Sequence, residues 1–84
     1  MIYIKESLGN YDTVEVRVDG ILDSQSVPIL KNVCEVHLNA DKKVLLQLDG
    51  LTHISREGRD FLRAIRNKVI MANIPEFVRL ETQD

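Results

Sequence analysis

The sequence is short of the residues from which disulfides and metal sites are built. Cys34 is the one cysteine in 84 residues, and the two histidines, His37 and His53, have no second histidine or cysteine at a clear ligand spacing. A single cysteine excludes an internal disulfide and a multi-cysteine metal site. We therefore expect Cys34 to be a small buried hydrophobic residue, and we expect no metal and no cofactor.

Long apolar runs are also missing. No run approaches the roughly 20 residues that span a bilayer, and the first ten residues, MIYIKESLGN, lack the basic and long apolar regions of a signal peptide. We expect no membrane insertion, and the cytoplasm is the expected compartment. The net charge of −2 argues against general nucleic-acid binding.

What is present is the composition of an ordinary globular domain. Hydrophobic residues make up 44% of the chain and charged residues 29%. A chain of this length buries only about 60–65% of its unfolded surface, which leaves too little for two separate cores. No linker, internal repeat or low-complexity segment interrupts it, so residues 1–84 are expected to form a single domain.

Alternation of apolar and polar residues predicts a β-hairpin near the N-terminus. The segments IYIKE (2–6) and TVEVRV (13–18) both alternate, as half-buried strands do. The segment SLGNYD (7–12) between them supplies the Gly-Asn pair that favours a turn.

A helix with one apolar face is expected after the hairpin. Its apolar residues recur at helical spacing: Leu30, Val33, Cys34, His37 and Leu38. Ser26 is the expected N-cap, and Pro28 is tolerated only within the first helical turn.

The second half of the chain predicts strand, helix and strand. The segment 42–50, KKVLLQLDG, is typical of a strand covered on both faces and is the expected central strand. The segment 55–73 is predicted to be a helix that ends at Asn73, before Ile74 and Pro75. Its apolar face consists of Gly58, Phe61, Leu62, Ile65 and Val69. The segment EFVRLE (76–81) alternates again and is the predicted last strand.

The predicted order is therefore β-β-α-β-α-β, an α/β fold. Two strand-helix-strand crossovers favour parallel neighbours and right-handed connections. We expect a mixed β-sheet of about four strands with helices packed on it.

Two segments resemble a known family, the STAS domain of sulphate transporters and anti-sigma factor antagonists. The segment VEVRVDGILDSQSVPILKNV (14–33) is similar to that family's strand, Gly-x-Leu-Asp turn and helix start. The segment KKVLLQLDGLTHISREGRDFLRAI (42–65) resembles its apolar strand, Asp-Ser-Ser-Gly turn and amphipathic helix. The resemblance extends from about residue 2 to 81 and implies a STAS-like fold.

The sequence departs from that family at the turn that carries regulation. In phosphorylatable members, the first serine of Asp-Ser-Ser-Gly accepts phosphate from a partner kinase. The corresponding residues here are Ser55, Arg56, Glu57 and Gly58, so Arg56 stands at the acceptor position and no phosphorylation is expected there. Ser55 is a candidate displaced by one residue, and we expect it to cap the helix instead.

The chain also stops after the last predicted strand, where family members usually continue into another helix. The resemblance therefore implies that one face of the sheet is incompletely covered. Exposed apolar area is usually buried by a partner or a second copy, so a homo-oligomer is possible. Phe77, Val78 and Leu80 are the residues expected near such a contact.

The segment from Ser55 to Lys68 carries five basic residues against two acidic ones. Four of the basic residues are spaced to line one flank of a helix: Arg56, Arg59, Arg63 and Arg66. This stripe is either a solvated helix face, on which Asp60 pairs with Arg63, or a docking surface for an acidic protein. Nucleic acid is a third reading, which the low aromatic content disfavours.

The residues predicted to contact a partner come from both family-like turns. Asp23 is expected to end a strand or cap the first helix, and the resemblance also places it in a partner-facing patch. The full predicted set is Asp23, Ser24, Ser55, Arg56, Glu57, Arg59 and Arg63.

These residues predict a non-catalytic protein–protein interaction module of STAS type. His53, Ser55 and Glu57 alternate at a strand end, a spacing that does not by itself supply the geometry of a catalytic triad, so we expect no enzyme. The resemblance implies a partner such as an anti-sigma factor or a kinase-like regulator. Two alternatives stay open: a structural subunit of a lipid-transport or other assembly, and a nucleotide or nucleic-acid binder that uses the arginine-rich helix.

Overall fold

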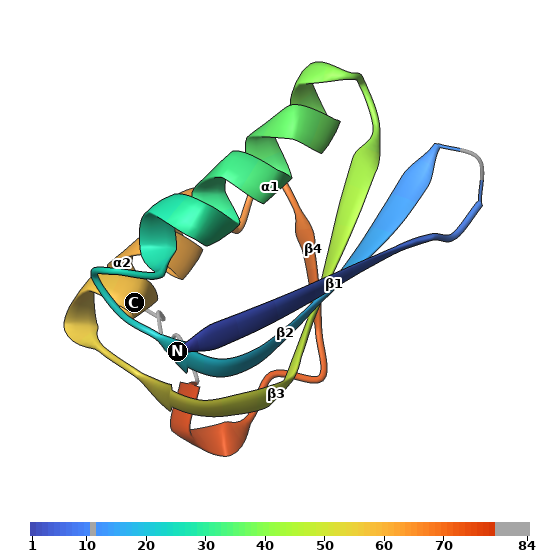
Figure 1. Ribbon diagram of the computed structural model, residues 1–84. Helices are drawn as coiled ribbons and strands as arrows, with labels where there is room; N and C mark the ends of the chain where they lie inside the picture. The colour runs from blue at the N-terminus through green and yellow to red at the C-terminus, as the bar shows by residue number, and fades with distance from the viewer. Residues whose placement is uncertain (11, 79–84) are drawn as a thin grey trace.

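The computed structural model describes residues 1–10 and 12–78, which form a four-stranded sheet with two α-helices (Figure 1). The order β-β-α-β-α-β is the predicted one. The elements are β1 (Ile2–Leu8), β2 (Thr13–Leu22), α1 (Val27–Asn39), β3 (Lys43–Ile54), α2 (Arg56–Ile65), β4 (Ile70–Ala72) and a short 3₁₀ turn, η1 (Glu76–Val78).

The sheet is mixed, as the sequence predicts. Its strands lie in the order β1-β2-β3-β4. The predicted hairpin makes β1 and β2 antiparallel, whereas the two helical crossovers make β2, β3 and β4 parallel.

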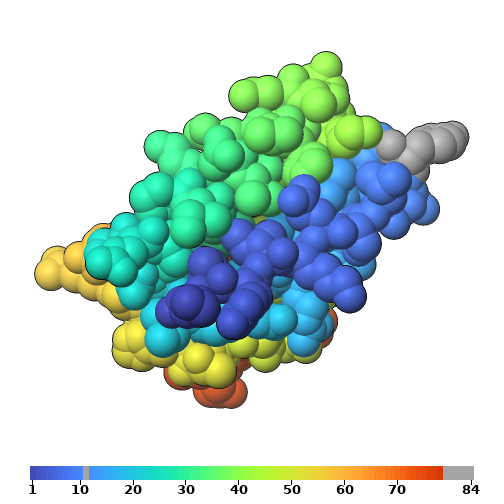
Figure 2. All heavy atoms as spheres, in the orientation of Figure 1, coloured from blue at the N-terminus to red at the C-terminus, as the bar shows by residue number. Residues whose placement is uncertain are grey.

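Both α-helices pack on the same face of this sheet. Alternate residues of β2 and β3 face them and are buried: Val14, Val16, Val18, Val44, Leu46 and Leu48. α1 adds Leu30 and Cys34 to this core, and α2 adds Phe61 and Leu62. Figure 2 shows that β1 and α1 also share one continuous outer surface, at the edge of the sheet.

The prediction that the segment 42–50 is covered on both faces is wrong. β3 is indeed one of the two interior strands, and Leu46 and Leu48 are buried. Leu45 and Gln47 are only half-buried, because they point to the face on which the described part of the chain places no helix. Within residues 1–10 and 12–78, no helix covers this face of the sheet.

The second helix is shorter than the sequence predicts, and the last strand comes earlier. α2 ends at Ile65 rather than at Asn73. The backbone N–H groups of Lys68 and Val69 donate to the Ile65 carbonyl at 2.8 and 3.2 Å and form the turn that follows the helix. Residues 70–72 then form β4 against residues 45–47 of β3. Pairing with an open sheet edge overrides the helical periodicity of this segment.

The predicted last strand, 76–81, is wrong where the structure describes it. Residues 76–78 form η1, and residues 79–81 lie outside the described residues. Val78 is fully buried in the core, so it is not available for the partner contact predicted for it, whereas Phe77 is about half exposed. Leu80 also lies outside the described residues.

Candidate functional site

The two family-like turns lie side by side at the carboxyl ends of β2 and β3. Because these strands are parallel neighbours, the segments that follow them leave the sheet at the same end. The Ser55 backbone N–H donates to the Leu22 carbonyl at 2.9 Å. Gly58 packs so closely that a Cβ there would lie 2.5 Å from the same carbonyl oxygen. A side chain at position 58 would force the two turns apart.

The first turn is organised by Asp23 and Ser26. Ser26 is the N-cap residue of α1, as predicted, but its side chain makes no cap hydrogen bond. Its buried hydroxyl instead turns back toward β2 and donates to the Ile21 carbonyl at 2.9 Å. The same hydroxyl oxygen accepts the Asp23 backbone N–H at 2.8 Å. Asp23 Oδ1 in turn accepts the backbone N–H groups of Gln25 and Ser26, each at 3.1 Å. Asp23 therefore closes the turn between β2 and α1.

These hydrogen bonds also fix the charge of the turn. The Ser26 backbone N–H is the main cause that lowers the pKa of the Asp23 carboxyl below its ordinary value of 3.8, against a smaller opposing effect of burial. Asp23 is therefore ionised at neutral pH. Ser24 is exposed beside it.

The second turn starts α2 as the sequence predicts. Ser55 is the N-cap, and its hydroxyl oxygen accepts the Gly58 backbone N–H at 3.2 Å, which confirms the predicted capping role. Arg56 is the first helical residue and is exposed, with Glu57 exposed next to it. A carboxylate in the first turn of a helix interacts favourably with the helix dipole.

The predicted arginine stripe is only partly formed. Arg63 pairs with Asp60 at 3.3 Å, as predicted. The guanidinium of Arg59 instead donates to the carbonyls of Phe77 and Val78, both at 3.4 Å, and so joins η1 to α2.

Because α2 ends at Ile65, the last basic residues of the predicted stripe lie at the helix end or beyond it. Arg66 is the C-cap of the helix, and Lys68 lies in the following turn. Arg56 is therefore the exposed basic side chain nearest to the junction of the two turns.

The structure also brings together polar side chains that no local sequence pattern predicts. Glu6 of β1 contacts His37 of α1, 31 residues away, through Oε1 and Nε2 at 2.5 Å. On the open face, Arg17 lies between two carboxylates, with Nε 3.2 Å from Asp19 and Nη1 3.4 Å from Asp49. His53 is exposed. Among the residues that the structure describes, no three His, Cys, Asp or Glu side chains gather as metal ligands would.

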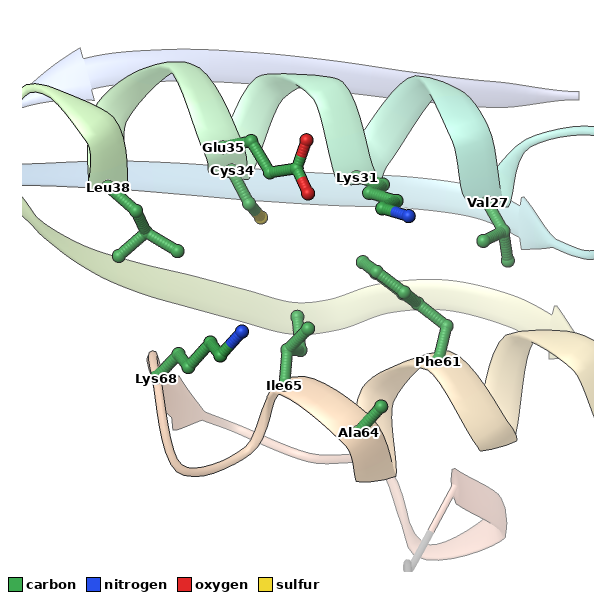
Figure 3. A pocket seen from close by; sticks show the side chains of 9 residues that line it. All are labelled: Val27, Lys31, Cys34, Glu35, Leu38, Phe61, Ala64, Ile65 and Lys68. Carbon is green, nitrogen blue, oxygen red and sulfur yellow. The ribbon is translucent and has the colours of Figure 1, made fainter.

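A cleft of about 370 Å³ separates α1 from α2 (Figure 3). Its lining is mostly apolar, and its charged residues are Lys31, Glu35 and Lys68. Cys34 also lines it, but burial, followed by the neighbouring Glu35 charge, raises the pKa of this thiol to about 11. The cleft therefore offers apolar surface without a reactive thiolate.

Comparison with known proteins identifies the fold. No protein-family model and no curated protein matches the sequence. Among solved structures, the chain is similar to the anti-sigma factor antagonist SpoIIAA in its unphosphorylated form, with a TM-score of 0.72 and 16% identity over 96% of this chain and 82% of that one. It is also similar to an uncharacterised protein with a SpoIIAA-like fold from Shewanella loihica, with a TM-score of 0.60 and 16% identity over 98% and 75%.

This protein therefore has the STAS-like α/β fold that its sequence resembles. No helix in the described ranges is both long and apolar enough to cross a membrane.

Proposed function

We propose that this protein is a non-catalytic module that binds another protein at the place where its two strand-to-helix turns meet. The residues there, which we call the junction surface, are the half-buried Asp23 and the exposed Ser24, Arg56 and Glu57. The observation that carries the proposal is the hydrogen bond from the Ser55 N–H to the Leu22 carbonyl. This bond joins two turns that are 33 residues apart in the sequence, so that they form one fixed surface.

A rigid surface of this kind suits recognition of a folded partner. The junction surface presents the ionised Asp23 and Glu57 beside the Arg56 guanidinium, so a complementary partner must offer charges of both signs. Its backbone is fixed by the Asp23, Ser26 and Ser55 hydrogen bonds, which reduces the entropy lost on binding.

The partner we propose is a cytoplasmic regulatory protein of the anti-sigma factor kind. SpoIIAA, which shares the fold, is an anti-sigma factor antagonist. Because Arg56 carries no hydroxyl, binding at this turn is proposed to be independent of phosphorylation. Nucleic acid is disfavoured, because Arg59 and Arg63 are engaged within the protein and do not form a free basic stripe.

Two side chains support a non-catalytic role. The hydroxyl of Ser55 serves as a helix cap, and the thiol of Cys34 is buried with a raised pKa. A nucleophile needs an adjacent base and access to substrate, and neither group has that arrangement.

Affinity capture with a charge-reversed variant tests the proposal. Arg56→Glu reverses the central charge of the junction surface, and a carboxylate at the first helical position is compatible with the helix dipole. Arg66→Glu, at the other end of α2, is the matched control. We expect the wild type and Arg66→Glu to retain the same protein from a nuclease-treated lysate of the source organism, and Arg56→Glu to lose it. Equal retention by Arg56→Glu, or bound material that nuclease removes, contradicts the proposal.

A further inference from the structure

The outer edge formed by β1 and α1 carries most of the strongly exposed large hydrophobic residues. Of eight such residues in the described ranges, five lie here: Met1, Tyr3, Leu8, Ile29 and Val36. Figure 2 shows β1, in dark blue, running beside α1, in green, across one face of the molecule. Exposed apolar side chains along one edge of a small domain favour a protein contact there.

No strand of the described residues pairs with the outer edge of β1. The Met1 carbonyl accepts the Ile21 N–H at 2.9 Å, so the polar groups of Met1 point toward β2. In an antiparallel pair these directions alternate along the strand. The N–H and C=O groups of Ile2, Ile4 and Glu6 therefore point outward, where the described residues place no further strand.

β1 has few of the features that usually protect an edge strand, although it carries the charged residues Lys5 and Glu6. It is seven residues long, its pairing with β2 contains no register shift, and it contains no proline and a single lysine, Lys5. The opposite edge is different, because β4 has only three residues. A strand such as β1 is a template for a further strand.

We propose that two copies of this chain associate through β1, with the two strands antiparallel about a two-fold axis perpendicular to the sheet. Such an axis continues the sheet from one copy to the other and keeps both pairs of helices on the same face. The interface adjoins the junction surface, because Ile29 lines one hollow with Asp23. The dimer is argued from the β1 edge alone, so it does not rest on the proposed binding function.

Among axes at Ile4, Lys5 and Glu6, charge favours the one at Ile4. An axis at Lys5 places this residue opposite its own copy, and an axis at Glu6 does the same for the glutamate, so both pairings oppose like charges. An axis at Ile4 places Tyr3 opposite Lys5 of the second copy, where an aromatic ring and an ammonium group attract each other. It also lets the outward N–H and C=O groups of Ile4 bond to those of its counterpart.

The same axis brings the two α1 helices into contact. α1 lies above the β1 side of the sheet, because His37 contacts Glu6 and Ile29 lines one hollow with Met1 and Ile2. With strands about 4.8 Å apart, helices centred above β1 and β2 of each copy lie about 10 Å apart, the ordinary spacing of packed helices. The outer stripe of α1 then meets its own copy, and its residues are Ile29, Val33 and Val36.

Sedimentation equilibrium of the full chain tests the proposal, from micromolar to millimolar concentration. The variant Ile29→Lys/Val36→Lys places charges in the helix contact. Its control is Ile70→Lys on β4, because Ile70 and Val36 are equally exposed, at 56% and 57%. We expect the wild type and Ile70→Lys to dimerise alike and the double variant to associate at least tenfold more weakly. A monomeric wild type, or loss of the dimer only in Ile70→Lys, overturns the proposal.

Paired cysteines test the position of the axis. Tyr3→Cys/Lys5→Cys places two thiols opposite each other across an axis at Ile4, in a closely spaced pair that suits a disulfide. Tyr3→Cys/Ser7→Cys does the same for an axis at Lys5 and is the matched control. We expect mild oxidation to produce a covalent dimer from the first variant only. A covalent dimer from the second variant alone overturns the axis at Ile4.

Discussion

Truncation of Leu46 to alanine tests which face of β3 belongs to the core. Leu46 has no exposed surface and lies at the middle of the sheet, where it pairs with Val16 of β2 and Met71 of β4. Strands on both sides hold its backbone, so the space left by the missing side-chain atoms cannot close by a backbone shift. The change should leave a cavity under the helices.

The expected loss is a large share of the stability of this protein. Leu→Ala at a fully buried position costs about 2–5 kcal/mol, and the rigid surroundings of Leu46 place it in the upper half of that range. A chain of this length is stabilised by about 4–13 kcal/mol in total. At about 4–8 °C per kcal/mol, the thermal midpoint should fall by roughly 14–40 °C.

Thermal and urea unfolding followed by circular dichroism measure this loss. Leu45→Ala is the matched control, because Leu45 is the next residue on the same strand and points to the open face, where it is only half-buried. We expect the control to lose less than about 1.5 kcal/mol. If Leu46→Ala unfolds at the wild-type midpoint, or if Leu45→Ala costs more, the assignment of the two sheet faces is wrong.

Three further predictions concern single side chains. Ser55→Ala should lower the free energy of unfolding by about 0.5–2 kcal/mol through loss of the helix cap. Ser24→Ala, on an exposed turn, is the control and should unfold as the wild type does. Phosphate on Ser55 in protein from its native cell would contradict the capping role. The lowered pKa of Asp23 should stabilise the folded state above its ordinary value of 3.8, and this contribution should disappear as the pH falls through the folded-state pKa. Asp23→Asn should therefore flatten the acid limb of a stability–pH curve, and an unchanged limb would refute the assignment. The buried Cys34 thiol, with its pKa raised to about 11, should react with a thiol reagent at pH 8 only as fast as the protein opens, so immediate labelling would show that it is exposed.

The sequence predicted most of the site's local structure because local chemistry decides it. The Ser55 cap follows from a hydroxyl residue placed just before a helical pattern, and the structure shows that bond. Ser26 also stands at the predicted N-cap position, but its side chain makes no cap hydrogen bond. Ser26 is buried against β2, and its hydroxyl bonds to a carbonyl that no local rule identifies.

The contacts between distant segments needed the folded chain. Glu6 and His37 are 31 residues apart, and the ion pair of Arg17 with Asp49 joins the neighbouring strands β2 and β3. Such pairs depend on the register of the strands and on where a helix crosses the sheet. Neither quantity is visible in a local pattern of residue types.

The sequence by itself determined the order of elements, the mixed sheet and the buried positions of β2. Alternating valines in β2 can bury one face only as a strand, and the apolar spacing of α1 can bury one face only as a helix. Only the tertiary structure decided the end of α2 and the place of β4. Residues 66–73 carry no strong preference for either state, and the unpaired edge of β3 supplied backbone partners for residues 70–72. Those hydrogen bonds form only once the sheet exists, so the sequence pattern alone could not reveal them.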